Sequence, residues 1–321
     1  MIKAIQKNIH FFTGLGYATI FGFSFMFTAE ILEYISSPFH LLSFRFIFAF
    51  LTMTIVQLAL GSRLKVKKVP ISKKLLLLVF FQPFLYFSAE TTGVRMTSSS
   101  EAGMMIALIP IFVAIFSAIF LKEHPKKIQI PFILSSVSGV VFIAIMQGRA
   151  DGEVISNLAG IIVLLVAVLA GAGFNITSRS LSVSLTPFQR TYSMMGAGAV
   201  IFTSIAVIQQ AVRGELTSFF QPLTYTEVLF PLLYLGILSS VVAFFLINFT
   251  LSRVSAAQGA VFANLVTVIS ITAGVFIRGE SFYYYHLIGA IFIITGVLGT
   301  NLLGKQTPVS TKSLYVKQKA S

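Results

Sequence analysis

The stretch RMTSSSEAGMMIALIPIFVAIFSAIFLKE, from Arg95 to Glu123, has a diverged copy in RVSAAQGAVFANLVTVISITAGVFIRGE, from Arg253 to Glu280. With one residue omitted near Met96, a constant offset of 157 residues aligns the two copies. The offset pairs Glu101 with Gln258, Pro110 with Thr267, Glu123 with Glu280, and Gly139 with Gly296. Because the offset is about half of the 321 residues, the chain consists of two similar halves.

The composition around this repeat is that of a membrane protein. Hydrophobic residues make up 56% of the chain and charged residues only 10%, whereas a soluble domain carries about 25% charged residues to meet water. The net charge of +13 does not indicate nucleic-acid binding, because the basic residues lie in short runs between apolar stretches. The chain has no cysteine, which excludes thiolate metal sites, and its four histidines lack metal-ligand spacing.

Apolar runs long enough to cross a bilayer occur ten times along the chain. A transmembrane helix needs about 20 mostly apolar residues, and the first run continues too far for a cleavable signal peptide. Prolines next to charged or hydroxyl residues mark the connections. The expected helices are 11–32, 39–60, 74–94, 101–121, 128–147, 157–177, 188–212, 227–249, 257–277 and 286–304. The sequence therefore predicts an all-α integral membrane protein with ten transmembrane helices.

Each half of the chain holds five of these helices, in residues 11–147 and 157–304, and a basic tail follows at 305–321. Because five is odd, the second half must enter the membrane in the opposite orientation. The charges agree, since the connection after the second helix is rich in Lys and Arg while its counterpart after the seventh has only Arg213. We expect two inverted five-helix repeats, a plan that recurs in transporters. A duplication that merely builds a larger bundle is the alternative.

The distribution of basic residues predicts the orientation of the helices. Eighteen Lys and Arg residues, Arg179 and Arg190 among them, are expected on one side, and only Arg95, Arg149, Arg213 and Arg278 on the other. Cytoplasmic loops carry the excess of positive charge. Both termini are therefore expected in the cytoplasm, with the chain in the cytoplasmic membrane of a bacterium.

A longer pattern surrounds each copy of the repeat. It reads YFSAETTGVRMTSSSEAGMMIALIPIFVAIFSAIFLKE in the first half and GILSSVVAFFLINFTLSRVSAAQGAVFANLVTVISITAGVFIRGE in the second. Together these segments resemble the duplicated EamA domain of the drug/metabolite transporter superfamily, and the resemblance covers nearly the whole chain.

The resemblance implies a ten-helix inverted-repeat transporter, commonly an exporter of amino acids, related metabolites or drugs. It also implies a central cavity lined mainly by helices 1, 3, 4, 6, 8 and 9, with helices 5 and 10 more peripheral. The second copy of the domain often has a proline where this chain has Thr267. We therefore expect helix 9 to be straighter than helix 4.

Ionisable side chains inside the predicted helices need an explanation, because a charge in hydrocarbon costs several kcal/mol. The candidates are Glu30, Arg45 and Glu90, together with Glu101 at the start of the fourth helix. Gln82, Tyr86 and Glu90 recur every four residues, so they are expected to share one helical face. One hypothesis is that Glu90 or Glu30 binds a proton or a cationic solute. The alternative is that Arg45 forms an ion pair with Glu30 or Glu90.

Uncharged polar and small residues add weaker signals. Buried amides can contact a polar solute or hydrogen-bond a neighbouring helix, and the candidates are Asn175, Asn248, Gln258 and Asn264. Pro110, near the middle of the fourth helix, frees a backbone carbonyl and predicts a kink. Small residues at Ser135 and Gly139, and at Gly196 and Gly198, predict close approach of helices.

The sequence contains no nucleophile–base set, metal cluster, phosphate-binding glycine loop or dinucleotide fingerprint. We therefore expect no enzymatic activity and no cofactor. The expected function is secondary transport, in which small metabolites are exported by alternating access with a proton as the candidate coupling ion. Uptake or facilitated diffusion by the same fold is one alternative. A receptor or scaffold that transports nothing is another.

Overall fold

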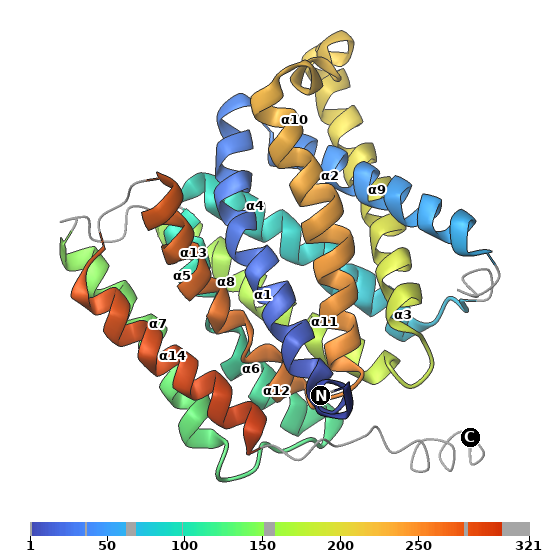
Figure 1. Ribbon diagram of the computed structural model, residues 1–321. Coiled ribbons are helices and arrows are strands. Elements are labelled where there is room, and N and C mark those ends of the chain that lie inside the picture. Colours follow the sequence, from blue (N-terminus) through green and yellow to red (C-terminus); the bar gives the residue numbers. More distant parts are fainter. Residues whose placement is uncertain are drawn as a thin grey trace.

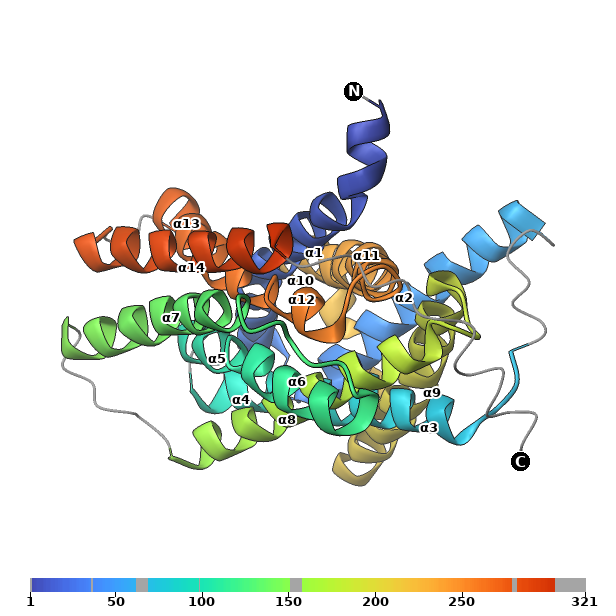
Figure 2. The same ribbon diagram turned by 90° about the horizontal axis from the view of Figure 1, so that it is seen from below.

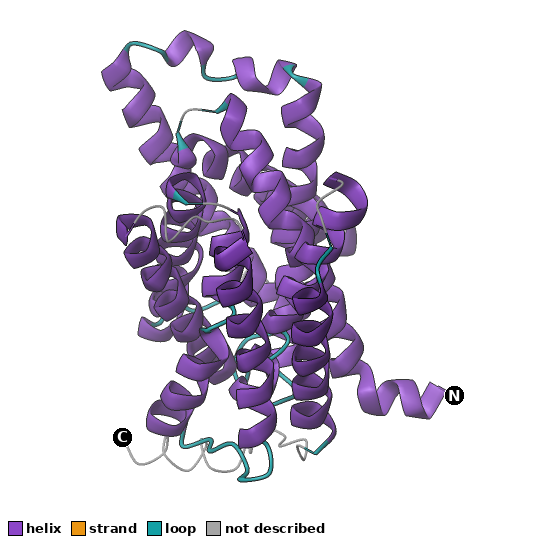
Figure 3. Cartoon of the chain, turned by 90° about the vertical axis from the view of Figure 1, so that its left-hand side faces the viewer, coloured by secondary structure: helices purple, strands orange, loops and turns teal. Residues whose placement is uncertain are grey.

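The apolar runs fold as helices in the computed structural model, which describes residues 2–35, 37–61, 69–97, 99–150, 158–278 and 282–303. No strand occurs among these residues (Figure 3). Within the described ranges, six helical segments are long and apolar enough to cross a membrane, and four further apolar helices are shorter. These segments follow the order of the ten expected helices. The expected basic tail at 305–321 lies outside the described residues.

The first half of the chain contains three continuous helices and two broken ones. The continuous helices are α1 (Ile2–Tyr34), α2 (Pro38–Leu60) and α7 (Ile130–Ala150). The third expected helix consists of α3 (Lys73–Val79), the π-helical turn η3 (Phe80–Leu85) and α4 (Tyr86–Met96). The fourth consists of α5 (Ser99–Ile106), α6 (Ile109–Phe116) and η4 (Ser117–Leu121).

The second half repeats this order. Its continuous helices are α8 (Leu158–Leu181), α9 (Pro187–Arg213) and α14 (Tyr284–Leu302), and two short turns, η5 (Leu216–Ser218) and η6 (Gln221–Thr224), follow α9. The eighth expected helix consists of α10 (Thr226–Leu233), η7 (Tyr234–Ala243) and α11 (Phe244–Leu251). The ninth consists of α12 (Ala256–Ala260) and α13 (Ala263–Arg278).

Helices α2 and α9 begin with the same local signature, a hydroxyl residue followed by Pro-Phe. In α9 the Thr186 hydroxyl accepts a hydrogen bond from the Gln189 amide, and the Gln189 side chain accepts one from the Thr186 amide. This capping box satisfies two N–H groups that a helix start leaves open. Proline suits the first turn because its missing N–H would have had no partner there. An offset of 149 residues relates the two starts and also pairs Gly22 with Gly171 and Phe25 with Phe174.

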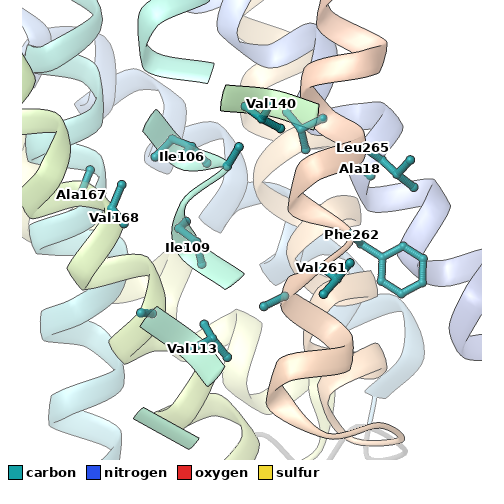
Figure 4. Packing of buried hydrophobic residues seen from close by; sticks show 14 of the residues in the cluster. Ala18, Ile106, Ile109, Val113, Val140, Ala167, Val168, Val261, Phe262 and Leu265 are labelled. Carbon is teal, nitrogen blue, oxygen red and sulfur yellow. The ribbon is translucent and has the colours of Figure 1, made fainter. Parts of the chain in front are cut away.

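The fourth helix is broken where Pro110 predicted a kink. The chain turns at Ala107 and Leu108, and Pro110 occupies the first turn of α6. A proline inside a continuous helix would remove a hydrogen bond and clash with the preceding turn, whereas at a helix start it costs little. Figure 4 shows Ile106 and Ile109 on either side of this break.

The ninth helix is broken too, so the expectation that it is straighter was wrong. The chain turns at Val261 and Phe262, and Thr267 lies within the continuous helix α13. The reason is a contact from α1: the Tyr17 hydroxyl donates to the Gly259 carbonyl at 2.6 Å. The Phe262 backbone amide also donates to this carbonyl, at 3.3 Å. The spacing of three residues is that of a turn tighter than the α-helix. A side chain that takes a carbonyl out of the helical ladder breaks the helix without a proline.

Two pairs of continuous helices flank the bundle, α2 against α9 on one side and α7 against α14 on the other (Figure 2). The small residues predicted for close approach lie in these contacts. A Cβ atom on Gly139 would stand 2.6 Å from the Gly289 carbonyl oxygen, and one on Gly198 would stand 2.5 Å from the Phe46 ring. The backbones therefore meet at distances that only glycine permits.

The two ends of the bundle differ in what they contain. As drawn in Figure 1, the lower end holds the first turns of α1 together with the short helix α12, and the upper end holds the turns η5 and η6 beside α10.

Candidate solute-binding site

A cavity lies between the two halves of the chain. Its wall comes from α1, the third and fourth segments, α8, the eighth and ninth segments, and one residue of α2, Arg45. These are the helices that the family resemblance implies, with α2 in addition. The wall is rich in aromatic side chains, namely Tyr17, Phe21, Phe25, Tyr86, Phe87, Phe174 and Phe244. Such a mostly apolar wall with few polar groups is typical of small-molecule sites.

Arg45 is the cation of this cavity, and its side chain is held in place on three sides. It is 1% exposed. Its Nε donates to the Ser240 hydroxyl at 2.9 Å and its Nη2 to the Ser239 hydroxyl at 2.8 Å. The guanidinium also stands 4.4 Å from the centroid of the Phe87 ring, an arrangement that attracts the cation to the ring face. Nη1 has no hydrogen-bond partner among the described residues.

Glu90 is the anion of the same cavity. It is 4% exposed, and its only hydrogen bond in the described part of the chain comes from the Thr91 hydroxyl to Oε2, at 3.0 Å. Its other oxygen, Oε1, accepts none. Removing a carboxylate from water is costly unless a cation or a proton compensates for the loss.

Arg45 and Glu90 make no direct ion pair, although their charges lie close enough to attract each other. The two hydrogen bonds of Arg45 go to serine hydroxyls, and no carboxylate oxygen of a described residue lies within 4.0 Å of its nitrogens. Glu30 is not Arg45's partner either. It is half-buried on α1 and is not part of the cavity wall. The 149-residue offset makes Arg179 the equivalent residue of the second half.

Two amide side chains add hydrogen-bond acceptors to the cavity. The Oδ1 atom of Asn175 and the Oε1 atom of Gln82 are buried without a partner among the described residues. The amide nitrogen of Asn175 donates to the Gly171 carbonyl at 2.8 Å, which fixes the side chain on α8. Buried acceptors normally have partners. Both oxygens are therefore available to a donor that enters the cavity.

The shared face of Gln82, Tyr86 and Glu90 is only partly helical. All three residues line the cavity, but Gln82 has the extended backbone angles φ −151° and ψ 119°. The following residue, Pro83, explains this, because proline disfavours the helical conformation in the residue before it. The apolar run 74–94 predicted one continuous helix, so the break at Gln82 was not expected.

The other amide candidates lie outside the cavity. Asn248 is held by three hydrogen bonds of its side chain: its Oδ1 accepts from Ser178, and its Nδ2 donates to Thr191 and to the Phe244 carbonyl. Gln258 forms a capping box with Ser255 at the start of α12. Asn264 donates to the Ser136 hydroxyl at 2.9 Å, which joins α13 to α7.

Two arginines counted among the eighteen on the expected cytoplasmic side are buried in helices. Arg179 is 2% exposed and Arg190 is 0% exposed. Arg190 donates to the Ser178 carbonyl and to the Asn248 carbonyl, both at 2.7 Å, and to the Ser252 hydroxyl. The carbonyls belong to the last turns of α8 and α11, whose partial negative charge favours a cation. These arginines therefore stabilise helix ends. Counting the basic residues in the connections did not predict this role.

The chain is similar to known transporters over nearly its whole length. The EamA-like transporter family matches residues 8–145 and again residues 158–302. The uncharacterized transporter YcxC of Bacillus subtilis (strain 168) is 36% identical over 303 residues, which is 94% of this chain and 96% of that protein. A probable terminal-alkyne amino-acid exporter of Streptantibioticus cattleyicolor is 26% identical over 66% of this chain and 68% of its own length.

A solved crystal structure shows the same fold, with a TM-score of 0.66 and 17% sequence identity. The match covers 89% of this chain and 99% of that chain. With its apolar helices and its duplicated domain, the protein is a multi-pass membrane protein that handles small solutes. The chain belongs to the EamA-like transporter family.

Proposed function

We propose that this transporter exports small metabolites that carry both an amino and a carboxylate group, such as amino acids or related solutes, across the cytoplasmic membrane by alternating access. The observation that carries the proposal is the coexistence of Arg45 and Glu90 in one cavity without an ion pair between them. Each retains an atom without a partner among the described residues. Two buried opposite charges that are not joined by a direct ion pair suit a solute that brings both counter-charges.

The polar groups divide the cavity into an anion subsite and a cation subsite. The Nη1 atom of Arg45 can donate to a carboxylate, and charge-assisted bonds of this kind are the strong ones. Glu90 Oε1 can accept from an ammonium group, and so can the unpaired oxygens of Gln82 and Asn175. The aromatic wall then faces the rest of the solute. The name of the relative from Streptantibioticus cattleyicolor, a probable amino-acid exporter, supports this class of solute.

Glu90 is also the proposed site for the coupling proton. A carboxylate in a low-dielectric cavity can be neutralised by a proton or by the solute's amino group, and competition between the two couples their fluxes. A proton gradient then drives the solute outward.

The proposed architecture is a pair of inverted repeats, residues 11–147 and 157–304. The packing supports it: α1 lies against α13, while its counterpart α8 lies against α5 and α6. Equivalent helices also pair, as α2 does with α9 and α7 with α14. Two halves of opposite orientation can exchange conformations, which opens one cavity to either side of the membrane in turn.

The proposed orientation places both termini in the cytoplasm. In intact cells we expect the thiol of Lys126→Cys, near the lower end, to be protected from an impermeant thiol reagent. The thiol of Gly214→Cys should react with it. The absence of native cysteines makes each introduced thiol the only target. Reaction of Lys126→Cys with the reagent applied from outside would contradict the proposed orientation.

Counterflow in proteoliposomes tests the function. Vesicles preloaded with one unlabelled amino acid should accumulate the same labelled amino acid transiently, and a panel of amino acids, amines and carboxylic acids identifies the class. The proposal expects counterflow only with solutes that carry both charges. Counterflow with amines or carboxylic acids alone would refute the proposed class. No counterflow with any solute of the panel would favour a receptor or scaffold.

A further inference from the structure

Glu123 joins the two halves of the chain at the lower end of the bundle. It follows η4 of the first half, and both of its carboxylate oxygens bind groups of the second half. Oε1 accepts from the Arg179 guanidinium of α8 at 3.0 Å, and Oε2 accepts from the backbone amide of Ala256 at 3.2 Å. The amide belongs to the first turn of α12, where a carboxylate is favoured by the helix dipole.

The guanidinium of Arg179 extends this connection to a third segment of the second half. Its Nη1 donates to the Leu251 carbonyl at 3.1 Å, at the last residue of α11. The Glu123 side chain is 28% exposed while that of Arg179 is 2% exposed. The carboxylate therefore reaches from the partly solvated surface to a buried cation, and the two side chains link four segments.

This polar cluster lies one helical turn beyond the cavity on each of three segments. Asn175 lines the cavity and Arg179 follows it by four residues on α8. Ile247 lines the cavity and Leu251 follows it by four residues on α11. On α12 the order is reversed, since Ala260 lines the cavity and Ala256 precedes it by four. One turn of helix rises about 5.4 Å, so the cluster lies about that far below the cavity.

We infer that Glu123 is the latch of a gate that closes the lower end of the cavity. The inference rests on the proposed alternating access. A solute that loads from the lower end must pass this layer, so Glu123 must release Arg179 and the Ala256 amide before the halves separate there. The bonds of Glu123 stabilise the state in which the lower end is closed, and their loss shifts the population toward the state in which it is open.

Arg190 has a different role in the same region, although it is also a buried cation. Its hydrogen bonds go to Ser178, Asn248 and Ser252, which all belong to the second half. It therefore holds that half together and does not cross the interface that has to open. The crossing contacts of this cluster are those of Glu123.

The test measures opening at the lower end without any solute. Spin labels are attached to the two thiols of the variant Lys126→Cys with Ser184→Cys. Both positions are exposed near the lower end, and they lie in different halves. Distances between the labels are measured in detergent and in lipid nanodiscs. Glu123→Gln keeps the size of the side chain but removes its charge. We expect the population with longer distances to rise by about tenfold in this variant.

Arg253→Gln is the matched control, because it removes an exposed cation two residues after Leu251 that stacks on Phe249 and takes no part in the cluster. It should give the wild-type distances. Arg179→Gln, a second variant, removes the partner of the latch and should reproduce the effect of Glu123→Gln. Wild-type distances in Glu123→Gln, with a wild-type melting temperature, would overturn the inference. Because no solute is present, this outcome is distinct from a failure of the proposed solute class.

Discussion

Replacing Arg45 by glutamine is expected to lower transport of amino acids by about 30-fold or more, because truncating one partner of a buried charge pair, here Arg45 with the solute's carboxylate, costs about 2–5 kcal/mol. Glutamine can still bond Ser240, so the local packing survives, but it offers no charge to the solute's carboxylate. Arg45→Lys keeps the charge and should retain part of the activity, since an ammonium lacks the fork of donors that reaches two serines and a carboxylate at once. Initial counterflow rates over a range of solute concentrations give the loss.

Arg253→Gln serves as the control for this experiment as well, because it removes an exposed arginine outside the cavity. Its rate should equal that of the wild type. If Arg45→Gln melts at the wild-type temperature and transports at the wild-type rate, the anion subsite is elsewhere.

Replacing Glu90 by glutamine is expected to remove most transport and to abolish its dependence on pH. The amide has the size of the carboxylate but can neither take up a proton nor neutralise an ammonium group. Flux measured across a range of pH should therefore vary in the wild type and stay flat in Glu90→Gln. Glu90→Asp keeps the charge one methylene further back and should keep the pH dependence at a lower rate.

The double variant Arg45→Gln with Glu90→Gln separates this account from a purely structural pair. If the two residues served only to neutralise each other, removing both would restore function. No such pair exists among the described contacts of Arg45, so we expect the double variant to be as inactive as Arg45→Gln. A wild-type rate and pH profile in Glu90→Gln would instead remove Glu90 from the mechanism and leave Glu30 as the charged candidate.

The helices could be predicted from the sequence because lipid imposes one simple requirement, an apolar run of sufficient length. The break at Pro110 was also predictable, since the ring acts on its own helix. The break at Val261 and Phe262 was not, because its cause is the hydroxyl of Tyr17, 242 residues away in the chain. Local sequence carries no sign of such a contact.

The charged residues of the cavity could be predicted because their burial is costly wherever they lie within a membrane helix. The amides could not be sorted in the same way. Asn175 lines the cavity while Asn248 joins three helices, and only the positions of distant partners distinguish them. The burial of Arg179 and Arg190 could not be predicted for a related reason: a basic residue near a helix end looks the same in sequence whether it meets headgroups or a buried carbonyl.

A single cysteine in the cavity tests the central claim, that one solute site opens alternately to both sides of the membrane. Ile247 lines the cavity, and Ile247→Cys would carry the only thiol of the chain because native cysteines are absent. An impermeant thiol reagent is applied to right-side-out and to inside-out vesicles, with and without the amino acid found by counterflow. The account predicts labelling from both sides and protection by the solute on each. Labelling from one side only, under every condition, would contradict it.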